Sequence, residues 1–358
     1  MMRIQCWPEM HSDHLALPIN PVLLYIICIY ICAMVDPNEA QKRRSSDDPD
    51  GKNDDAVVCV GSSSSSAKAT KRRKRDPLKI ALLGCGAINS TVAKMITHQE
   101  AGPASLKAVL VRNERSNEEI QSLFPTTTSD AAGECCFTTD PDTFFSDDSG
   151  WDLCIEAAGQ PAVRQYGKRC LETGRDLMIT SIGALTDDAL YEDLRSTAEA
   201  SGARLILCTG SMPALDWMGS AALDHCTEVK VTQIKPPRAW LGTPAEAAHP
   251  DLLTMKDKPR VLFEGSARDA ASAFPKNANT AAMLALATAG LHDTKASLVA
   301  DPSATSNRVE LSFRGTAGNI QVQVEAAPSK TNPRTSAIVA LSVVKAIRKL
   351  CCTVVVGL

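Results

Sequence analysis

Residues 78–96, which read LKIALLGCGAINSTVAKMI, place the strongest constraint on how this chain can fold. The apolar run 80–83 is typical of a buried strand, and a glycine turn and an amphipathic helix follow it. In a turn of this kind Gly84 makes the bend, and Gly86 has no side chain to keep a phosphate away from the backbone. The pattern predicts the strand–turn–helix unit of a dinucleotide-binding fold.

The first turn of that helix is the expected phosphate contact. It begins at Ala87 and Ile88, where free N–H groups and the positive end of the helix dipole favour an anion. The third fingerprint position is Asn89, where glycine or alanine usually allows close helix–strand packing. Because a lone G-x-G is a weak signal, an ordinary strand–helix turn is the alternative interpretation.

Composition narrows the class of protein. The 358 residues are 44% hydrophobic but only 4% aromatic, so the core must be built mainly from Ala, Val, Leu and Ile. This balance suits an α/β protein, and the length allows two domains. The net charge of −3 argues against nucleic-acid binding, which needs a basic surface.

The thirteen cysteines are scattered, several of them inside apolar runs, as at Cys154 and Cys170. Buried thiols in a reducing, cytoplasmic compartment are the simplest interpretation. No two close pairs have the spacing of a zinc site, so we expect no metal.

Residues 1–76 differ in composition from the rest and are expected to lie outside the folded domains. Residues 15–35 carry no charge and are just long enough to cross a bilayer. They are interpreted either as a membrane anchor or as part of an upstream gene-model extension, with Met34 as the true start. Residues 36–75 are of low complexity and predict a disordered linker. Its KRRKR run, 71–75, is a solvated charge run, a nuclear signal or a patch for anionic membrane.

Residues 77–215 predict the dinucleotide-binding domain, a Rossmann-type parallel sheet with alternating helices. The expected strands after the first are 106–111, 153–158, 176–181 and 204–208. Their carboxyl ends meet at the edge of the sheet where ligands bind. Arg112 stands where an acidic residue often contacts the ribose, so it either meets the 2′-phosphate of NADP or lies in a solvent-facing loop.

Residues 216–332 show a different pattern and predict a second, α+β domain for substrate binding and homodimer formation. The expected strands are 229–234, 261–265, 309–313 and 320–325, and a small-residue run, 266–287, lies between them. A last apolar helix within 333–358 is expected to return to the nucleotide-binding domain.

Several long motifs in residues 78–350 resemble the L-aspartate dehydrogenase family. They are GCGAI from Gly84, EAAGQPAV from Glu156, GRDLMITSIGAL from Gly174, TGSMPALD from Thr209, KPP from Lys235, FEGSARDAASAFPKNANTAAMLALA from Phe263, VADP from Val299 and PSKTNPRTSAIVALS from Pro328. The run from Phe263, together with VADP and NPRTS, is idiosyncratic enough to be specific to this family.

The resemblance implies an enzyme that oxidises L-aspartate to iminosuccinate with NAD or NADP, or runs the reverse amination. Iminosuccinate either feeds NAD biosynthesis or hydrolyses to oxaloacetate and ammonia. By position, Ser211 replaces a family alanine whose backbone meets the cofactor, and Asn279 matches a cofactor-binding asparagine.

A dicarboxylate substrate needs cationic or N–H partners, and two side chains are candidates. Lys235 is interpreted either as a substrate-binding lysine or as a surface lysine before a Pro-Pro turn. Asn277 is interpreted as a substrate contact or, like Asn279, as a helix cap.

One position departs from the family pattern. The resemblance places a catalytic histidine in an Asn-x-His motif after the ADP segment, but here Asn307 is followed two residues later by Val309. Valine cannot transfer a proton. His292 and Arg308 are the nearby candidates to replace the histidine. Otherwise a local shift in the alignment hides the true residue. The alternative functions are a catalytically weak or inactive relative that binds nucleotide and serves a regulatory or interaction role, and a homoserine-dehydrogenase-like enzyme that acts on another small acid.

Overall fold

The computed structural model describes residues 76–358 except 124–134, 257, 330–331, 333–334 and 358. The chain divides into two units, Met1–Lys71 and Arg72–Leu358, and the features below belong to the second. The apolar stretch 15–35, the expected linker and the basic run 71–75 lie outside the described residues. Within the described part, no helix is both long and apolar enough to span a bilayer.

The first sheet is parallel throughout, with the strand order β3-β2-β1-β4-β5-β6. This is the strand order of a dinucleotide-binding Rossmann fold, so the predicted fold class is confirmed. The strands are β1 (Leu78–Leu83), β2 (Ala104–Leu110), β3 (Cys136–Thr138), β4 (Leu153–Glu156), β5 (Asp176–Ile179) and β6 (Leu205–Leu207).

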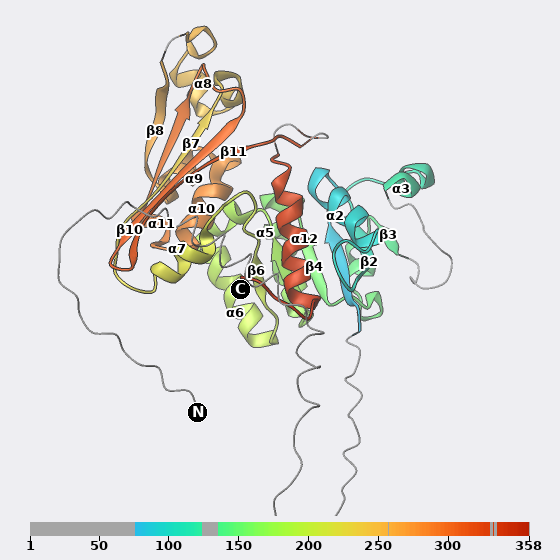
Figure 1. Cartoon of the computed structure of the whole chain (residues 1–358). Helices are drawn as coiled ribbons and strands as arrows, with labels where there is room; N and C mark the ends of the chain where they lie inside the picture. Colours follow the sequence, from blue (N-terminus) through green and yellow to red (C-terminus); the bar gives the residue numbers. More distant parts are fainter. Residues whose placement is uncertain (1–75, 124–134, 257, 330–331, 333–334, 358) are drawn as a thin grey trace, which may run out of the picture. The chain divides into compact units, whose positions relative to one another are not determined.

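Helices cover both faces of this sheet (Figure 1). They are α2 (Ala87–Thr97), α3 (Asn117–Leu123), α4 (Pro141–Phe145), α5 (Gln160–Glu172), α6 (Asp188–Ser201) and α7 (Leu215–Ala221). Because successive side chains of a strand point to opposite faces, β1 contributes to two cores. Ile80 and Leu82 pack with α2, whereas Ala81 and Leu83 join the core that includes α5 and α6.

The second sheet is mixed, with the order β11-β10-β7-β9-β8. Strands β7 and β9 are parallel, and the other neighbours are antiparallel. The strands are β7 (Cys226–Lys235), β8 (Arg260–Ser266), β9 (Thr294–Ala300), β10 (Asn307–Gly315) and β11 (Gly318–Ala326). The helices between them are α8 (Pro244–Ala248), α9 (Ala267–Ala273), α10 (Ala278–Ala287) and α11 (Gly290–Asp293).

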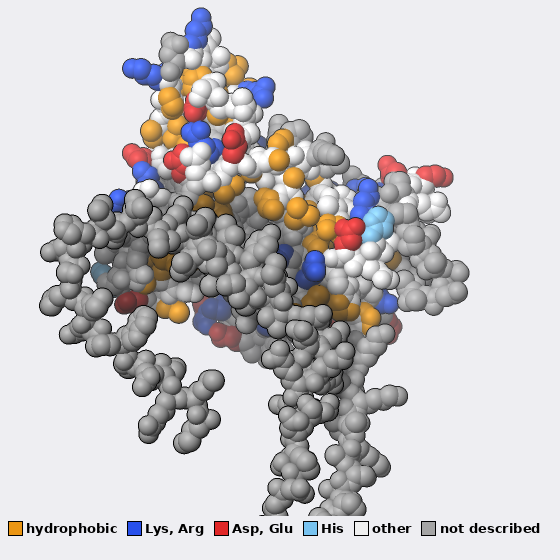
Figure 2. Space-filling model, viewed as in Figure 1, with side chains coloured by type: hydrophobic (Ala, Val, Ile, Leu, Met, Phe, Trp, Pro, Cys, Tyr) orange, Lys and Arg blue, Asp and Glu red, His pale blue; other side chains and the backbone are white. Residues whose placement is uncertain are grey.

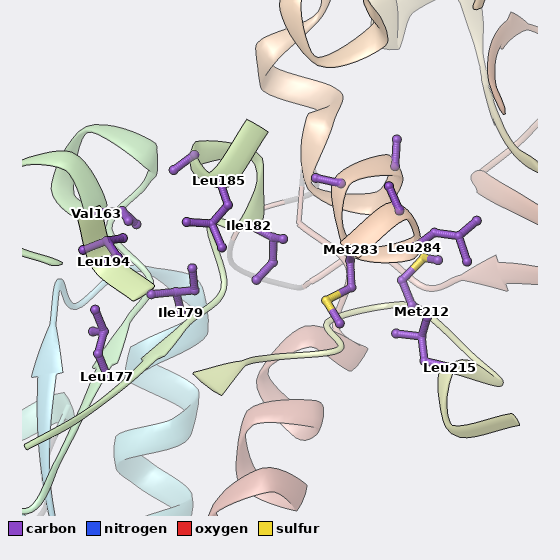
Figure 3. Packing of buried hydrophobic residues seen from close by; sticks show 14 of the residues in the cluster. Val163, Leu177, Ile179, Ile182, Leu185, Leu194, Met212, Leu215, Met283 and Leu284 are labelled. Atoms are coloured by element: carbon purple, nitrogen blue, oxygen red, sulfur yellow. The ribbon is translucent and has the colours of Figure 1, made fainter. Parts of the chain in front are cut away.

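One hydrophobic core joins the two sheets. Figure 3 shows Leu177 and Ile179 of β5 packing with Val163 and Leu194, and the same cluster continues to Met283 of α10. Since α10 also packs against the 3₁₀ helix η3 (Ile182–Thr186), the second sheet is anchored to the loop that follows β5.

The last helix, α12 (Ile338–Cys351), returns to the first sheet and lies beside α2 (Figure 1). Val343 and Ile347 are fully buried there, against Val92 and Ile96 of α2. The helix that follows β1 and the last helix of the chain therefore cover the same face of the parallel sheet.

On the face shown in Figure 2, basic and acidic side chains are interspersed over the strands of the second sheet. Ion pairs also join strands of this sheet: Lys230 Nζ on β7 lies 3.3 Å from a Glu264 carboxylate oxygen on β8, across β9, and Lys295 Nζ on β9 lies 3.1 Å from a Glu228 oxygen on the adjacent β7.

Candidate active site

A cavity of about 460 Å³ lies where the carboxyl ends of β4, β5 and β6 meet one end of the second sheet. Ligands of open parallel sheets bind at this edge. The first sheet and α2 contribute Ile88, Ala157, Gly159, Thr180, Ser181, Ile182, Cys208, Thr209, Gly210, Ser211 and Met212. The rest of the lining is Gln233, Lys235, Lys276, Asn277, Asn279, Thr280, Met283, Asn307, Val309, Ala326, Asn332, Thr335, Ser336 and Val339.

The glycine turn after β1 has the geometry that a pyrophosphate requires. Gly84 has a φ of +86°, and a Cβ built on it would lie 2.7 Å from the Cβ of Ala158, so only glycine fits. A Cβ on Gly86 would meet nothing within 4 Å, which leaves open space in front of the backbone. No side chain caps α2 at Gly86, and no acidic residue stands in its first turn. The N–H groups at Ala87 and Ile88 therefore face an open, electropositive site that fits a phosphate.

Asn89 has a structural role at the third fingerprint position. Its side chain is fully buried, and its Nδ2 donates to the carbonyls of Leu83, Gly84 and Ile155 at 3.2, 2.9 and 3.2 Å. The amide thus satisfies acceptors at the ends of β1 and β4. Where a small residue would allow close packing, this chain holds α2 against the sheet by hydrogen bonds.

Glu156, at the end of β4, organises two of the loops that line the cavity. One carboxylate oxygen accepts from the Ala158 and Gly159 N–H groups at 2.7 and 2.8 Å and from the Ser181 hydroxyl at 2.9 Å, and the other accepts from the Ser181 N–H at 3.1 Å. Burial raises the pKa of Glu156, and these four donors oppose that effect. This role was not predicted from the sequence, although a glutamate inside the apolar run LCIEAA was its signal.

The end of β2 presents basic side chains. Arg112 is exposed, and it does not line the cavity. Arg115, which the sequence analysis missed, donates from Nη2 to the carbonyl of Cys85 at 3.0 Å, so its guanidinium lies over the glycine turn. The residues immediately after β2, Val111 to Asn113, include no carboxylate.

Lys235, the last residue of β7, reaches into the cavity from the second sheet. Its Nζ donates to Oδ1 of Asn277 and lies 5.0 Å from the ring centre of Trp240. Burial lowers the pKa of Lys235 to about 8. An amine with this pKa can change its protonation state close to neutral pH.

The two predicted asparagines lie at the start of α10, where Asn277 is the N-cap residue and Asn279 is the second residue of the helix. The backbone carbonyl of Asn277 accepts from Gln233 Nε2 at 3.0 Å, which fixes the start of α10 to β7. Asn279 Oδ1 accepts from the Gly183 N–H at 2.8 Å. Both asparagines and Ser211 line the same cavity, so the fold brings these three predicted site residues together.

Val309 lines the cavity, at the place where the resemblance requires an acid/base group. It pairs directly with Gln233 across β10 and β7. Arg308 points to the other face of the strand, where its guanidinium lies 3.2 Å from Glu310 and 3.6 Å from Asp301. Arg308 is therefore not available to replace the histidine.

His292 lies outside the cavity. It belongs to the short helix α11, not to a loop, and it is exposed. Its Nε2 accepts from Arg268 Nε at 3.0 Å. Strand β9 runs about 20 Å from the end near His292 to Ala300, which pairs with Lys235. The structure therefore separates His292 from the other predicted site residues.

The strand order, the glycine turn and the cavity at the sheet edge define the class, a dinucleotide-binding protein of the Rossmann type with a second sheet domain. Comparisons with known proteins then identify the family. Residues 84–207 match the family model described as homoserine dehydrogenase, NAD binding domain, and residues 216–350 match aspartate dehydrogenase, C-terminal.

L-aspartate dehydrogenase of Ralstonia pickettii is 35% identical over 270 residues, which cover 75% of this chain and 96% of the relative. L-aspartate dehydrogenase 2 of Bordetella bronchiseptica is 38% identical over 274 residues, covering 76% and 96%. The crystal structure of aspartate dehydrogenase from Thermotoga maritima has the same fold, with a TM-score of 0.59 and 21% identity over 78% of this chain and 99% of that one. The chain belongs to the L-aspartate dehydrogenase family, as its motifs predicted. It is an oxidoreductase whose cofactor is NAD or NADP.

Proposed function

We propose that this chain catalyses the NAD(P)-dependent oxidation of L-aspartate to iminosuccinate, or the reverse amination. The observation that carries the proposal is the charge of the cavity. Lys235 and Lys276 line it, and none of its described lining residues is an aspartate or glutamate. A basic cavity at the carboxyl edge of a nucleotide-binding sheet suits a substrate with two carboxylates.

The cofactor site is proposed to run from the glycine turn into the cavity. The backbone at Gly84 and Gly86 and the N–H groups of Ala87 and Ile88 would hold the pyrophosphate. Ser211 and Asn279 would contact the nicotinamide end, because both line the cavity. When bound, the nicotinamide ring accepts a hydride from the substrate.

Arg112 is proposed to meet the 2′-phosphate of NADP, with Arg115 beside it. The support is the two arginines after β2, which flank Asn113 and Glu114, and the contact of Arg115 with the carbonyl of Cys85 in the glycine turn. A strand end of this type accommodates NADP, whereas an aspartate or glutamate there favours NAD.

The substrate is proposed to lie between the end of β6 and the second sheet. Lys276 and the backbone N–H groups of Gly210 and Ser211 are the partners for its carboxylates. Lys235 and Asn277, already joined by a hydrogen bond, would face its amino group. This arrangement would hold the substrate Cα–H near the nicotinamide, as transfer over about 3–3.5 Å requires.

The proposal extends to the setting of the reaction. The product hydrolyses to oxaloacetate and ammonia or enters NAD biosynthesis. The described cysteines are all free thiols, which supports the cytoplasmic location. The exposed side chains of β11 at Asn319, Gln321 and Gln323 leave a polar sheet face available for a homodimer.

A second candidate function is a catalytically weak or inactive relative that binds nucleotide and has a regulatory or interaction role. Val309 favours it, because a valine lines the cavity at the expected histidine position. Loss of an acid/base group costs about 10² to 10⁴ in rate unless another group replaces it.

The test is aspartate-dependent formation of NADH and NADPH by the purified chain, with nucleotide binding measured in parallel. Homoserine and other small amino acids serve as comparison substrates. Turnover with aspartate and not with homoserine supports the proposal. Nucleotide binding without turnover supports the second candidate, and absence of nucleotide binding contradicts both.

A further inference from the structure

We propose that Lys235 is the acid/base residue of this enzyme and acts in place of the histidine that is absent at Val309. The inference rests on the proposed function. It assigns the proton transfer to a residue that the resemblance does not identify, on a different strand from the expected histidine.

The register of the second sheet places Lys235 within reach of the vacated position. Val309 on β10 pairs with Gln233 on β7, and Lys235 follows Gln233 on the same face of β7. Residues on this diagonal of an antiparallel pair are about 7 Å apart at the backbone. Val309, Gln233 and Lys235 all line the cavity. The long side chain of Lys235 therefore extends its amine into the cavity that Val309 also lines.

Few other lining groups can exchange a proton. Among the described residues that line the cavity, the titratable side chains are Lys235, Lys276 and Cys208. Lys276 is exposed, and no hydrogen bond or ring contact with a described residue, like those of Lys235, holds its amine in the cavity. Burial raises the pKa of the Cys208 thiol, and its sulfur is engaged with the Ser342 hydroxyl at 3.2 Å. Lys235 is thus the cavity amine whose surroundings favour a neutral form.

The charged side chains near Lys235 form their hydrogen bonds and ion pairs with other residues. Its backbone carbonyl accepts from the Asp301 N–H at 2.9 Å, but the Asp301 carboxylate accepts from the Ser303 hydroxyl at 2.6 Å and faces Arg308 at 3.6 Å. Arg308 also pairs with Glu310. Among the described carboxylates, none lies within ion-pair distance of Lys235 Nζ, and burial lowers the pKa of this amine to about 8.

Two neutral contacts aim the amine without adding charge. Asn277 Oδ1 accepts one of its N–H groups, and the Trp240 ring lies 5.0 Å from Nζ. Trp240 is fully buried and donates from Nε1 to the carbonyl of Val299 at 3.2 Å, so the ring is fixed. A rigid amine that remains close to its substrate is what proton transfer requires.

The proton transfer balances in both directions. In oxidation, the neutral amine of Lys235 accepts a proton from the ammonium group of aspartate. The lone pair left on the substrate nitrogen would form the C=N bond as the Cα hydrogen leaves with its bonding electrons, the hydride that an NAD(P)⁺ held in the proposed cofactor site would accept. Lys235 then releases its proton to water. In amination, protonated Lys235 returns that proton to the substrate nitrogen after the C=N bond has been reduced.

The test compares five forms of the full chain: wild type, Lys235→Met, Lys235→Arg, Val309→His and Lys235→Met with Val309→His. Methionine removes the amine at similar volume, whereas arginine keeps the charge but cannot release a proton near neutral pH. For each form we would measure NADPH and NADH binding, kcat and KM for aspartate, and the dependence of kcat/KM on pH.

We expect wild-type oxidation to rise with pH through about 8, because the neutral amine is the base. Lys235→Met and Lys235→Arg should each lower kcat by about 10² to 10⁴, and the rise of kcat/KM through about pH 8 should disappear. Nucleotide binding should be unchanged. The ammonium group of the substrate also titrates with pH, but the pH dependence that it causes would persist in Lys235→Met. Adding Val309→His to Lys235→Met should raise kcat at least tenfold above that of Lys235→Met alone. The rise of kcat/KM with pH should then lie toward about pH 6.5, the usual pKa of histidine.

Three results would overturn the inference. In the first, Lys235→Met raises KM and leaves kcat and the rise of kcat/KM with pH intact, so that Lys235 only binds substrate. In the second, Lys235→Arg retains kcat, so that charge alone matters. In the third, wild type binds nucleotide without turning over aspartate, which refutes the activity as well. Failure of the wild type is thus distinguishable from failure of Lys235 alone.

Discussion

Asn279 on α10 accepts a hydrogen bond from the backbone N–H of Gly183, at 2.8 Å, across the boundary between the two sheets. Gln160 Nε2 donates to the Pro275 carbonyl at 2.9 Å across the same boundary. These two bonds fix the start of α10 over the loops that follow β4 and β5. The cavity is therefore shaped by contacts between residues about 100 positions apart in the chain.

Asn279→Ala should weaken NAD(P)H binding by about 10- to 100-fold. The variant leaves the Gly183 N–H without its acceptor and removes the amide from the cavity wall, which costs about 1–3 kcal/mol. Fluorescence titration with NADH and NADPH measures it. Asn319→Ala, on exposed strand β11, is the control and should bind normally. Unchanged binding in Asn279→Ala would contradict the role given to this residue.

Gly86→Ala and Gly84→Ala should fail in different ways. Gly86 has a φ of −87° and free space around it, so alanine should fold normally but weaken nucleotide binding at least tenfold by intruding on the phosphate. Gly84→Ala should also lower stability, since its Cβ would collide with Ala158. Gly202→Ala is the control for positive φ without collision, with φ +75° and open surroundings. Thermal unfolding and nucleotide titration separate the two effects. Normal NADH binding by Gly86→Ala would place the pyrophosphate elsewhere.

Asn89→Ala should lower Tm by about 2–8 °C, because the carbonyls of Leu83, Gly84 and Ile155 each lose a hydrogen bond from a buried amide. The corresponding loss of unfolding free energy is about 1–3 kcal/mol. Ser90→Ala, on the same helix, removes only a 3.4 Å contact with the Ala87 carbonyl and is the control. Calorimetry of both variants measures the difference. Equal melting temperatures would mean that the Asn89 bonds add nothing to stability.

Lys235→Met should stabilise the fold at neutral pH while it removes activity. Folding lowers the pKa of this amine from 10.5 to about 8, so the charged form is disfavoured in the folded state. The resulting penalty is fully present below pH 8 and disappears as pH rises to about 10.5. Removing this penalty raises the free energy of unfolding by up to about 3 kcal/mol at pH 7, minus the contribution of the lost contact with Asn277.

Urea unfolding of Lys235→Met at pH 7 and pH 10 measures this gain, which should shrink at the higher pH. Lys276→Met is the matched control, because it makes the same substitution at an exposed lysine that lines the same cavity. A gain of equal size at both pH values would mean that methionine simply packs better than lysine.

Arg112→Asp should shift cofactor preference toward NAD. An aspartate there repels the 2′-phosphate of NADP and can bond the ribose hydroxyls of NAD. We expect the ratio of NADPH to NADH affinity to fall at least tenfold. Lys345→Asp, an exposed residue of α12, makes the same change in charge and should leave the ratio unchanged. An unaltered ratio in Arg112→Asp would place Arg112 in solvent, clear of the cofactor.

The sequence by itself determined the nucleotide-binding fold. Local signals were enough, because the buried strand, the glycine turn and the helix of residues 78–96 are adjacent in the chain. The regular alternation of strands and helices then limited the sheet to a parallel one. The long motifs also identified the family, which the relatives confirm.

Only the tertiary structure decided what surrounds the site. Val309 and Lys235 are 74 residues apart, and their proximity depends on the register between β10 and β7, which no local pattern specifies. His292 is only 17 residues from Val309, yet β9 carries the chain to the opposite end of the sheet between them. Closeness in the sequence therefore suggested His292 as a neighbour of Val309, whereas the pairing of the strands brings Lys235 near it.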